Sequence, residues 1–152
     1  MFIDTNLETL IPFFNKLKAE TVPLWGSMSA QRMVEHLTDT LRIATGENPQ
    51  KMEIPEEKID RMVAFLDSEK PMARNMVVPF APADAPLRHQ EIELAIDEYI
   101  ETWLDLEALY SINPDLRNPH PYYGPLSYEQ WKRLNAKHLT HHFIQFGLIE
   151  DK

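Results

Sequence analysis

The sequence predicts an all-α fold, a four-helix bundle with long crossover connections, formed by residues 1–152 as one domain. The chain has only four glycines, and little of it alternates between apolar and polar residues as a half-buried strand would. Eight of its twelve prolines fall within residues 71–86 and 113–126, which marks both segments as irregular connections over the bundle, because a helix interior rejects proline. Between these connections, apolar residues recur at helical spacing.

The first helix is expected over about residues 5–18. Thr5 and Glu8 have the spacing of a capping box, in which a threonine hydroxyl caps the helix start. Pro12 lies inside this helix, so a kink or a restart is expected there. The second helix is expected over residues 29–45, because a serine stands at its start and a glycine follows its end.

Three further helices are expected in the rest of the chain. A shorter one covers about residues 55–70, and the longest covers about residues 87–112 with one apolar face. The last helix covers about residues 127–147 and opens with Ser127 and Gln130 at capping-box spacing. The positions of the longest helix outside its apolar face carry acidic residues that predict a solvated surface: Glu91, Glu93, Asp97, Glu98, Glu101 and Asp105.

The composition argues against several classes of function. A net charge of −9 disfavours nucleic acid or an anionic membrane as the main partner, since both attract clustered lysine and arginine. The chain has no cysteine, which excludes a thiolate metal site and a cysteine nucleophile. The N-terminus has no secretory signal, and no apolar run approaches the roughly 20 residues that span a bilayer. A cytoplasmic protein is therefore expected.

The last helix contains three of the six histidines, and all three fall within a stretch of five residues, 138–142. At 100° per residue, His138 and His142 lie one turn apart inside the buried arc, and His141 lies at its margin. Two neutral imidazoles at i and i+4 can direct their nitrogens at one point, as in helical two-histidine metal sites. On the second helix, His36 lies at the edge of the apolar arc, so a third imidazole is available from a different helix.

Two interpretations of these histidines remain open on spacing alone. Burying three imidazoles without partners costs desolvation energy and adds no apolar area, whereas a shared divalent cation would satisfy all three. Alternatively, each histidine is a separate core residue with a hydrogen bond to a carbonyl or a carboxylate. A His-x-x-x-His pair on a helix is common by chance, so the spacing does not decide between them.

Two stretches resemble the DinB/YfiT-like superfamily, and most closely a branch described as a domain of unknown function. They are WGSMSAQRMVEHL (residues 25–37) and HPYYGPLSYEQWKRLNAKHLTHHFIQFGL (residues 120–148). The second holds the more specific pattern, H-x-x-H-H-x-x-Q after an H-P-x-Y/F-G-x-L turn. The resemblance implies a four-helix bundle, usually dimeric, with a divalent metal held by one histidine of the second helix and two of the last. Position by position, these are His36, His138 and His142.

The metal is expected to be Zn²⁺, Ni²⁺ or Fe²⁺, since imidazole suits all three. Three ligands leave coordination open, and an ion held this way can activate a water or a thiol. The superfamily includes thiol-dependent transferases and hydrolases. The resemblance therefore implies an enzyme that activates water or a low-molecular-weight thiol for attack on a small-molecule substrate. A non-catalytic metal-dependent binding module and a structural dimer are the alternatives. The residues expected to wall the site are Trp131, Leu134 and Phe143.

The residues expected around the ligands have weaker signals. Asp39 either accepts the second N–H of His36 or is a surface carboxylate, and Gln145 can hydrogen-bond a ligand imidazole; these two are the catalytic candidates. Glu107 is the other candidate base by helical phase. Trp25 is expected to anchor the chain before the second helix rather than to wall the site. The residues expected to pack loops rather than to reach metal or substrate are His120, Tyr122 and Tyr123.

A homodimer is expected, because Leu94, Leu104 and Leu109 extend the apolar surface of the longest helix beyond its main stripe. The alternative is a monomer in which that helix is buried on two sides. Light scattering at micromolar concentration distinguishes the two by the mass of the particle.

Overall fold

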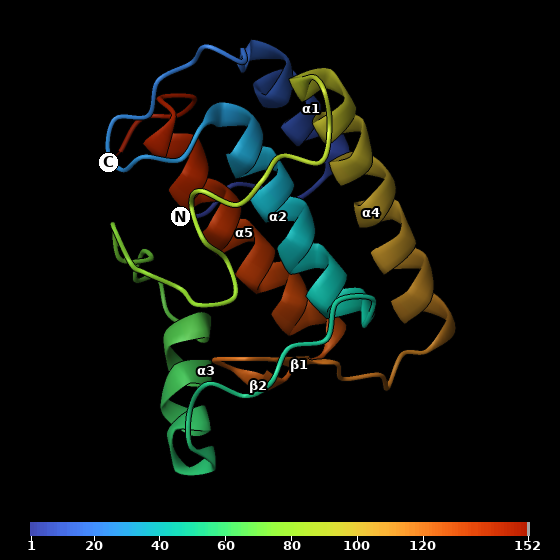
Figure 1. The fold of residues 1–152 in the computed structure, drawn as a ribbon. Coiled ribbons are helices and arrows are strands. Elements are labelled where there is room, and N and C mark those ends of the chain that lie inside the picture. Colours follow the sequence, from blue (N-terminus) through green and yellow to red (C-terminus); the bar gives the residue numbers. More distant parts are fainter. Residues whose placement is uncertain (152) are drawn as a thin grey trace.

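The computed structural model describes residues 1–151 and shows a mainly helical molecule (Figure 1), as predicted. A short 3₁₀ helix (Glu56–Lys58) precedes the third α-helix, and two short strands form an antiparallel hairpin, β1 (Pro119–His120) and β2 (Gly124–Pro125). This hairpin was not predicted, because strands of two residues are too short to show an alternating pattern. The α-helices are α1 (Leu7–Lys16), α2 (Ala30–Thr45), α3 (Ile59–Asp67), α4 (Ile92–Ile112) and α5 (Tyr128–Gln145).

The boundaries of α2 and α5 follow from their caps, as predicted. Ser29 accepts a backbone hydrogen bond at the start of α2, and Gly46 ends that helix in the left-handed conformation with φ 85°. Ser127 and Gln130 form the complete capping box of α5. These local contacts fix where the two helices begin, and both helices carry the candidate metal ligands.

The start of α1 differs from the prediction. Asn6 is the N-cap and accepts the backbone N–H of Glu8, whereas Thr5, the predicted cap, is buried. The helix continues through Pro12, so the predicted restart does not occur. It ends at Lys16, two residues before the predicted boundary.

The start of α4 also differs, because residues 87–91 are held in a non-helical conformation by a carboxylate from α2. The carboxylate belongs to Glu35, whose side chain is fully buried. It accepts the backbone N–H of Arg88 at 2.7 Å, the side-chain amide of Gln31 at 3.0 Å and the backbone N–H of His89 at 3.4 Å. These donors offset the desolvation of the charge and fix the path of the chain into α4.

Replacing Glu35 by alanine is expected to lower the free energy of unfolding by about 3 kcal/mol or more, because three donors lose their acceptor. Urea denaturation followed by circular dichroism measures the change. The matched control is Glu91→Ala, which removes an exposed carboxylate without a capping hydrogen bond. That control is expected to stay within about 0.5 kcal/mol of the wild type. Similar losses in both variants would contradict the role assigned to Glu35.

The main core lies between α2, α4 and α5 (Figure 1), where α2 and α4 run in one direction and α5 runs in the other. α1 packs against this core through Phe14, whose ring contacts those of Tyr99 in α4 and Phe143 in α5. Within residues 1–151, no helix combines the length and the apolar composition needed to cross a membrane.

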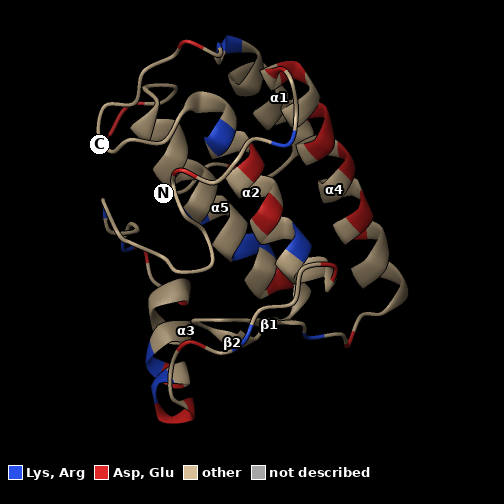
Figure 2. Ribbon diagram, in the orientation of Figure 1, with Lys and Arg blue, Asp and Glu red and all other residues tan. Residues whose placement is uncertain are grey.

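The outward face of α4 is acidic (Figure 2), as predicted. Glu98 is the exception: it is largely buried and pairs with Arg42 at 3.1 Å and Arg88 at 2.7 Å. Leu94 and Leu104 are exposed on this helix, as the predicted dimer requires, whereas Leu109 is partly buried against the core. The dimer itself stays a prediction.

Both proline-rich connections pack over the helices. The connection after α3 has no helix or strand and passes in front of α2 and α5 in Figure 1. The connection after α4 carries the hairpin, below α2 in the same view. The two connections meet where Phe80 packs against His120 and Tyr122, with ring centroids 5.7 and 5.3 Å apart. They therefore form one cover at this end of the molecule.

Candidate metal centre

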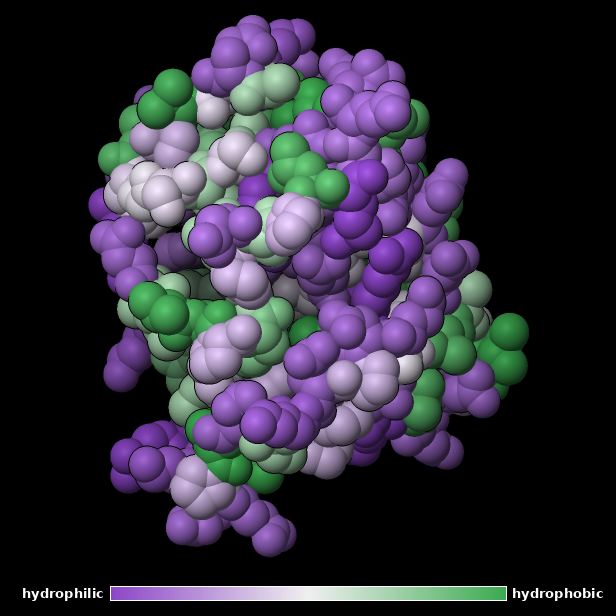
Figure 3. Space-filling model, in the orientation of Figure 1, coloured by the Kyte–Doolittle hydropathy of each residue, from purple (hydrophilic) through white to green (hydrophobic). Residues whose placement is uncertain are grey.

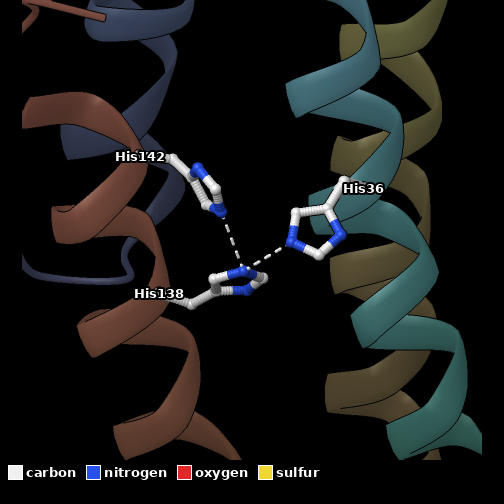
Figure 4. A group of neighbouring side chains, drawn as sticks. All are labelled: His36, His138 and His142. Carbon is white, nitrogen blue, oxygen red and sulfur yellow. Dashed lines mark hydrogen bonds between the residues drawn. The ribbon is translucent and has the colours of Figure 1, made fainter. Parts of the chain in front are cut away.

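Three histidines converge between α2 and α5 (Figure 4). Nε2 of His138 lies 2.8 Å from Nε2 of His36 and 3.0 Å from Nε2 of His142. One nitrogen of each ring lies within 4.8 Å of those of the other two. His138 and His142 are buried, and His36 is partly exposed. The structure therefore brings together the three residues predicted as ligands, and they could hold a metal ion.

The three rings do not satisfy one another by hydrogen bonds. A nitrogen of a neutral imidazole either donates or accepts, so Nε2 of His138 cannot serve both neighbours equally well. Nδ1 of His36 is buried without a hydrogen-bond partner. In the described part of the chain, neither a carboxylate nor a backbone carbonyl accepts a hydrogen bond from the three rings. The alternative of separate core histidines, each with such an acceptor, therefore does not describe this cluster.

Gln145 determines which nitrogen of His142 carries the hydrogen. Its Nε2 donates to the backbone carbonyl of Trp25 at 3.1 Å, which turns its Oε1 toward Nδ1 of His142 at 2.7 Å. An amide oxygen only accepts, so Nδ1 of His142 is protonated and Nε2 keeps a lone pair directed into the cluster. Histidines that bind metals commonly have such a partner on the other nitrogen. The predicted hydrogen bond between Gln145 and a candidate ligand is confirmed.

The backbone at Gly26 allows this contact. Gly26 has φ +80°, a conformation that residues with a side chain rarely adopt, and a Cβ there would lie 3.1 Å from Nε2 of Gln145. The N–H of Leu24 donates to the backbone carbonyl of Gln145 at 2.7 Å. Trp25 provides the second attachment, because its carbonyl accepts the Gln145 side-chain amide. The chain before α2 is thus anchored to the end of α5, which is the role predicted for Trp25.

Burial keeps all three imidazoles neutral. Desolvation, together with the positive charge of Arg32, lowers the pKa of His36 from 6.5 to about 3. Desolvation and the neighbouring histidines lower the pKa values of His138 and His142 well below 6.5. Neutral imidazole is the form that binds metals. An unperturbed imidazole is protonated below about pH 6.5, so the lowered pKa values shift the loss of metal affinity on acidification to lower pH.

The spacing of the nitrogens fits a divalent ion. Zn–N bonds of about 2.0–2.1 Å place two ligand nitrogens roughly 3.3 Å apart around a tetrahedral ion. The two contacts of His138 are 2.8 and 3.0 Å long. Rotations of the rings that lengthen these two contacts slightly and bring the third pair of nitrogens, which lies within 4.8 Å, to the same spacing would accommodate the ion.

Neither predicted base contacts the histidines. Asp39 accepts hydrogen bonds from Arg32 at 3.2 Å and from Arg88 at 2.7 Å, and it does not orient His36. Glu107 is exposed on α4, where it accepts a hydrogen bond from a tyrosine hydroxyl at 3.4 Å. Asp39 thus helps to hold the connection before α4 against α2. Sequence reasoning missed this network because its arginines are far apart in the chain.

The other predicted residues lie around the cluster rather than in it. The ring of His141 packs edge-on against those of His142 and Trp25, with centroids 4.9 and 5.6 Å apart. His120 is buried in β1, and its Nδ1 accepts the backbone N–H of Tyr122 at 3.0 Å. Its packing role is confirmed. The aromatic rings that pack against His120 are those of Phe80, Tyr122, Tyr123 and Trp131.

The three apolar residues predicted to wall the site, Trp131, Leu134 and Phe143, are all buried. The ring of Phe143 packs against Phe13 and Phe14 of α1, with centroids 5.7 and 5.3 Å apart. Phe143 therefore belongs to the core between α1 and α5.

Comparison of the chain with known proteins identifies no relative. No protein-family model matches it, and neither a curated protein nor a solved structure is significantly similar. The interpretation of the site therefore depends on its own residues.

Replacing Gln145 by alanine is expected to weaken Zn²⁺ binding about ten- to a hundredfold, the usual effect of losing the partner of a ligand histidine. The cause is that Nδ1 of His142 loses the acceptor that fixes its tautomer. Calorimetric titration with Zn²⁺ measures the change. His141→Ala is the matched control, since it removes a neighbouring imidazole outside the cluster and should bind like the wild type. If both variants lose the same affinity, Gln145 has no specific role.

Proposed function

We propose that His36, His138 and His142 bind one divalent ion, Zn²⁺, Ni²⁺ or Fe²⁺, and that the protein is a metal-dependent enzyme. Its reaction is the attack of water or a low-molecular-weight thiol on a small electrophilic molecule, by hydrolysis or transfer. The observation that supports this best is the convergence of three neutral imidazole nitrogens from two helices. Three protein ligands with open coordination are typical of catalytic zinc sites, whereas structural sites have four.

The residues of the chain hold and orient the ion. Gln145 fixes the tautomer of His142, so that Nε2 presents its lone pair, and burial keeps His36 and His138 unprotonated. An ion bound there would supply Lewis acidity, which lowers the pKa of a water or a thiol at its open position. Asp39 is engaged by two arginines, so we assign it to positioning of the connection rather than to proton transfer.

The fold proposal is that α1, α2, α4 and α5 form a four-helix bundle of the DinB/YfiT type, with α3 as an addition. Its support is the placement of the histidines on α2 and α5, together with the sequence patterns over residues 25–37 and 120–148. A homodimer and a cytoplasmic location are part of the same proposal.

The experiment is a screen of the metal-loaded protein with common thiols and an aryl halide, and with ester and amide substrates. The control is His138→Ala under the same conditions. A rate well above that control supports the enzyme. If no rate exceeds it while the wild type still binds metal, the metal-dependent binding module is the better assignment. If removal of the metal also leaves the melting temperature unchanged, the structural dimer is favoured.

A further inference from the structure

A cavity of about 90 Å³ lies beside the candidate metal centre, along α5. His141 lines this cavity and also packs against His142, so only one imidazole separates the two sites. The surface in Figure 3 is hollowed on the left of the view, next to the position of α5 in Figure 1. The lining combines apolar side chains, among them Trp25 and Met72, with the basic side chains of Arg74 and Lys137.

Lys137 is a buried cation without a carboxylate partner. Its side chain is 1% exposed, and its Nζ donates to the carbonyl oxygens of Phe65 and Lys70, both at 2.7 Å. Within residues 1–151, no carboxylate oxygen lies within 4.0 Å of it. An ammonium has three donors, of which two bind these carbonyl oxygens, and the Nζ also lies 3.9 Å from the centre of the Phe65 ring.

Arg74 is the second cation of the cavity. Its guanidinium lies 3.9 Å from the centre of the Trp25 ring and bonds the carboxylate of Asp151 at 2.7 Å. Both side chains of that ion pair are at least half exposed, so the pair contributes little and can exchange. The contact shows that a carboxylate can reach Arg74 at the edge of the cavity.

We propose that this cavity binds a small organic carboxylate. Arg74 and Lys137 attract the anionic group, and Trp25 and Met72 contact a short apolar chain. The cavity has about the volume that three water molecules occupy in liquid water, which suits an acid of a few carbon atoms. Binding does not require the metal, so this site goes beyond the function proposed above. Where both hold, His141 places the carboxylate ligand next to the metal centre.

The test is calorimetric titration of the metal-free protein with butyrate and with butyramide. The two molecules have the same apolar chain and differ in charge, so butyrate is expected to bind with saturation and butyramide to bind at least about tenfold more weakly. Equal binding of the two would overturn the proposal. Chloride and inorganic phosphate are titrated in parallel, and a response to them as strong as that to butyrate would indicate an adventitious ion only.

Variants locate the site. Arg74→Met is expected to weaken butyrate binding at least about tenfold, whereas Asp151→Asn is expected to strengthen it by removing the competing carboxylate. The matched control is Arg61→Met, which removes an exposed arginine of α3 outside the cavity. Lys137→Met removes the buried charge, but it can also disturb the fold. The butyrate affinity of Arg74→Met is therefore the deciding measurement. Unchanged affinity in Arg74→Met would refute the site.

The metal proposal is separated from this one by His138→Ala. That variant is expected to lose metal and to keep butyrate binding, because His138 does not line the cavity. Loss of butyrate binding in a folded His138→Ala variant would contradict the independence of the two sites. Failure of the metal proposal alone would leave butyrate binding unchanged.

Discussion

Replacing His138 by alanine is expected to abolish stoichiometric binding of Zn²⁺, Ni²⁺ or Fe²⁺. His138 is the central member of the cluster, since its Nε2 contacts both His36 at 2.8 Å and His142 at 3.0 Å. Its removal leaves two imidazoles on different helices. The loss of affinity should exceed about a hundredfold, because even the loss of a ligand's hydrogen-bond partner costs ten- to a hundredfold. Elemental analysis and metal titration of the purified variant measure it.

The same loss is expected for His36→Ala and His142→Ala, whereas His141→Ala should retain its metal. Thermal unfolding gives a second measure, because a ligand at about a thousand times its Kd stabilises the folded state by about 4 kcal/mol. The melting temperature of the wild type should therefore rise with Zn²⁺, and that of His138→Ala should not. Equal metal occupancy in all four variants would show that the cluster is not the binding site.

The helices could be predicted wherever the signals are local. Ser29, Gly46 and Ser127 mark helix ends through contacts within a few residues, and the structure has all three as predicted. The start of α4 could not be predicted in this way. It depends on Glu35, which lies more than 50 residues earlier in the chain and holds the backbone N–H of Arg88. Nothing in the sequence around Glu35 indicates that its carboxylate binds a backbone N–H so far along the chain.

The same distinction applies to the site. The convergence of His138, His142 and Gln145 follows from spacing on one helix, and the helical phase of α2 adds His36. Asp39 is also close to His36 in helical spacing. Its carboxylate, however, binds Arg88, which lies 49 residues away in the chain, and does not bind His36. Lys137 precedes His138 and gave no signal in the sequence. Its burial depends on carbonyl groups at the end of α3 and just after it.

In the metal-free protein, acid is expected to cause a large loss of stability between pH 7 and pH 5. Four histidines have strongly lowered pKa values: those of His36 and His120 fall to about 3, and those of His138 and His142 lie well below 6.5; burial lowers the pKa of His141 as well. In the unfolded chain these groups titrate near 6.5. Below that pH the unfolded state therefore binds more protons than the folded state, and stability falls as pH falls. Above it, their contribution to stability is complete.

Each such histidine costs about 1.4 kcal/mol for every pH unit below its unfolded value. Four of them approach 5 to 6 kcal/mol per unit, which is comparable with the whole stability of a typical domain, about 5–15 kcal/mol. The free energy of unfolding from urea titrations at pH 7, 6 and 5 measures this slope. The carboxylates contribute little in that range, because their ordinary pKa values lie below it.

His120 provides the control for this slope, since it is buried among aromatic rings and is not a candidate ligand. His120→Phe keeps an aromatic ring in place and removes one of the four histidines whose pKa values are strongly lowered. Its slope should fall by about a fifth to a quarter, whatever the change in absolute stability, because the slope counts protons rather than contacts. A wild-type stability that stays constant from pH 7 to pH 5 would mean that these histidines titrate in the folded protein as they do in the unfolded chain. The imidazoles of the cluster would then be protonated below about pH 6.5, and metal affinity would be lost from that pH downward.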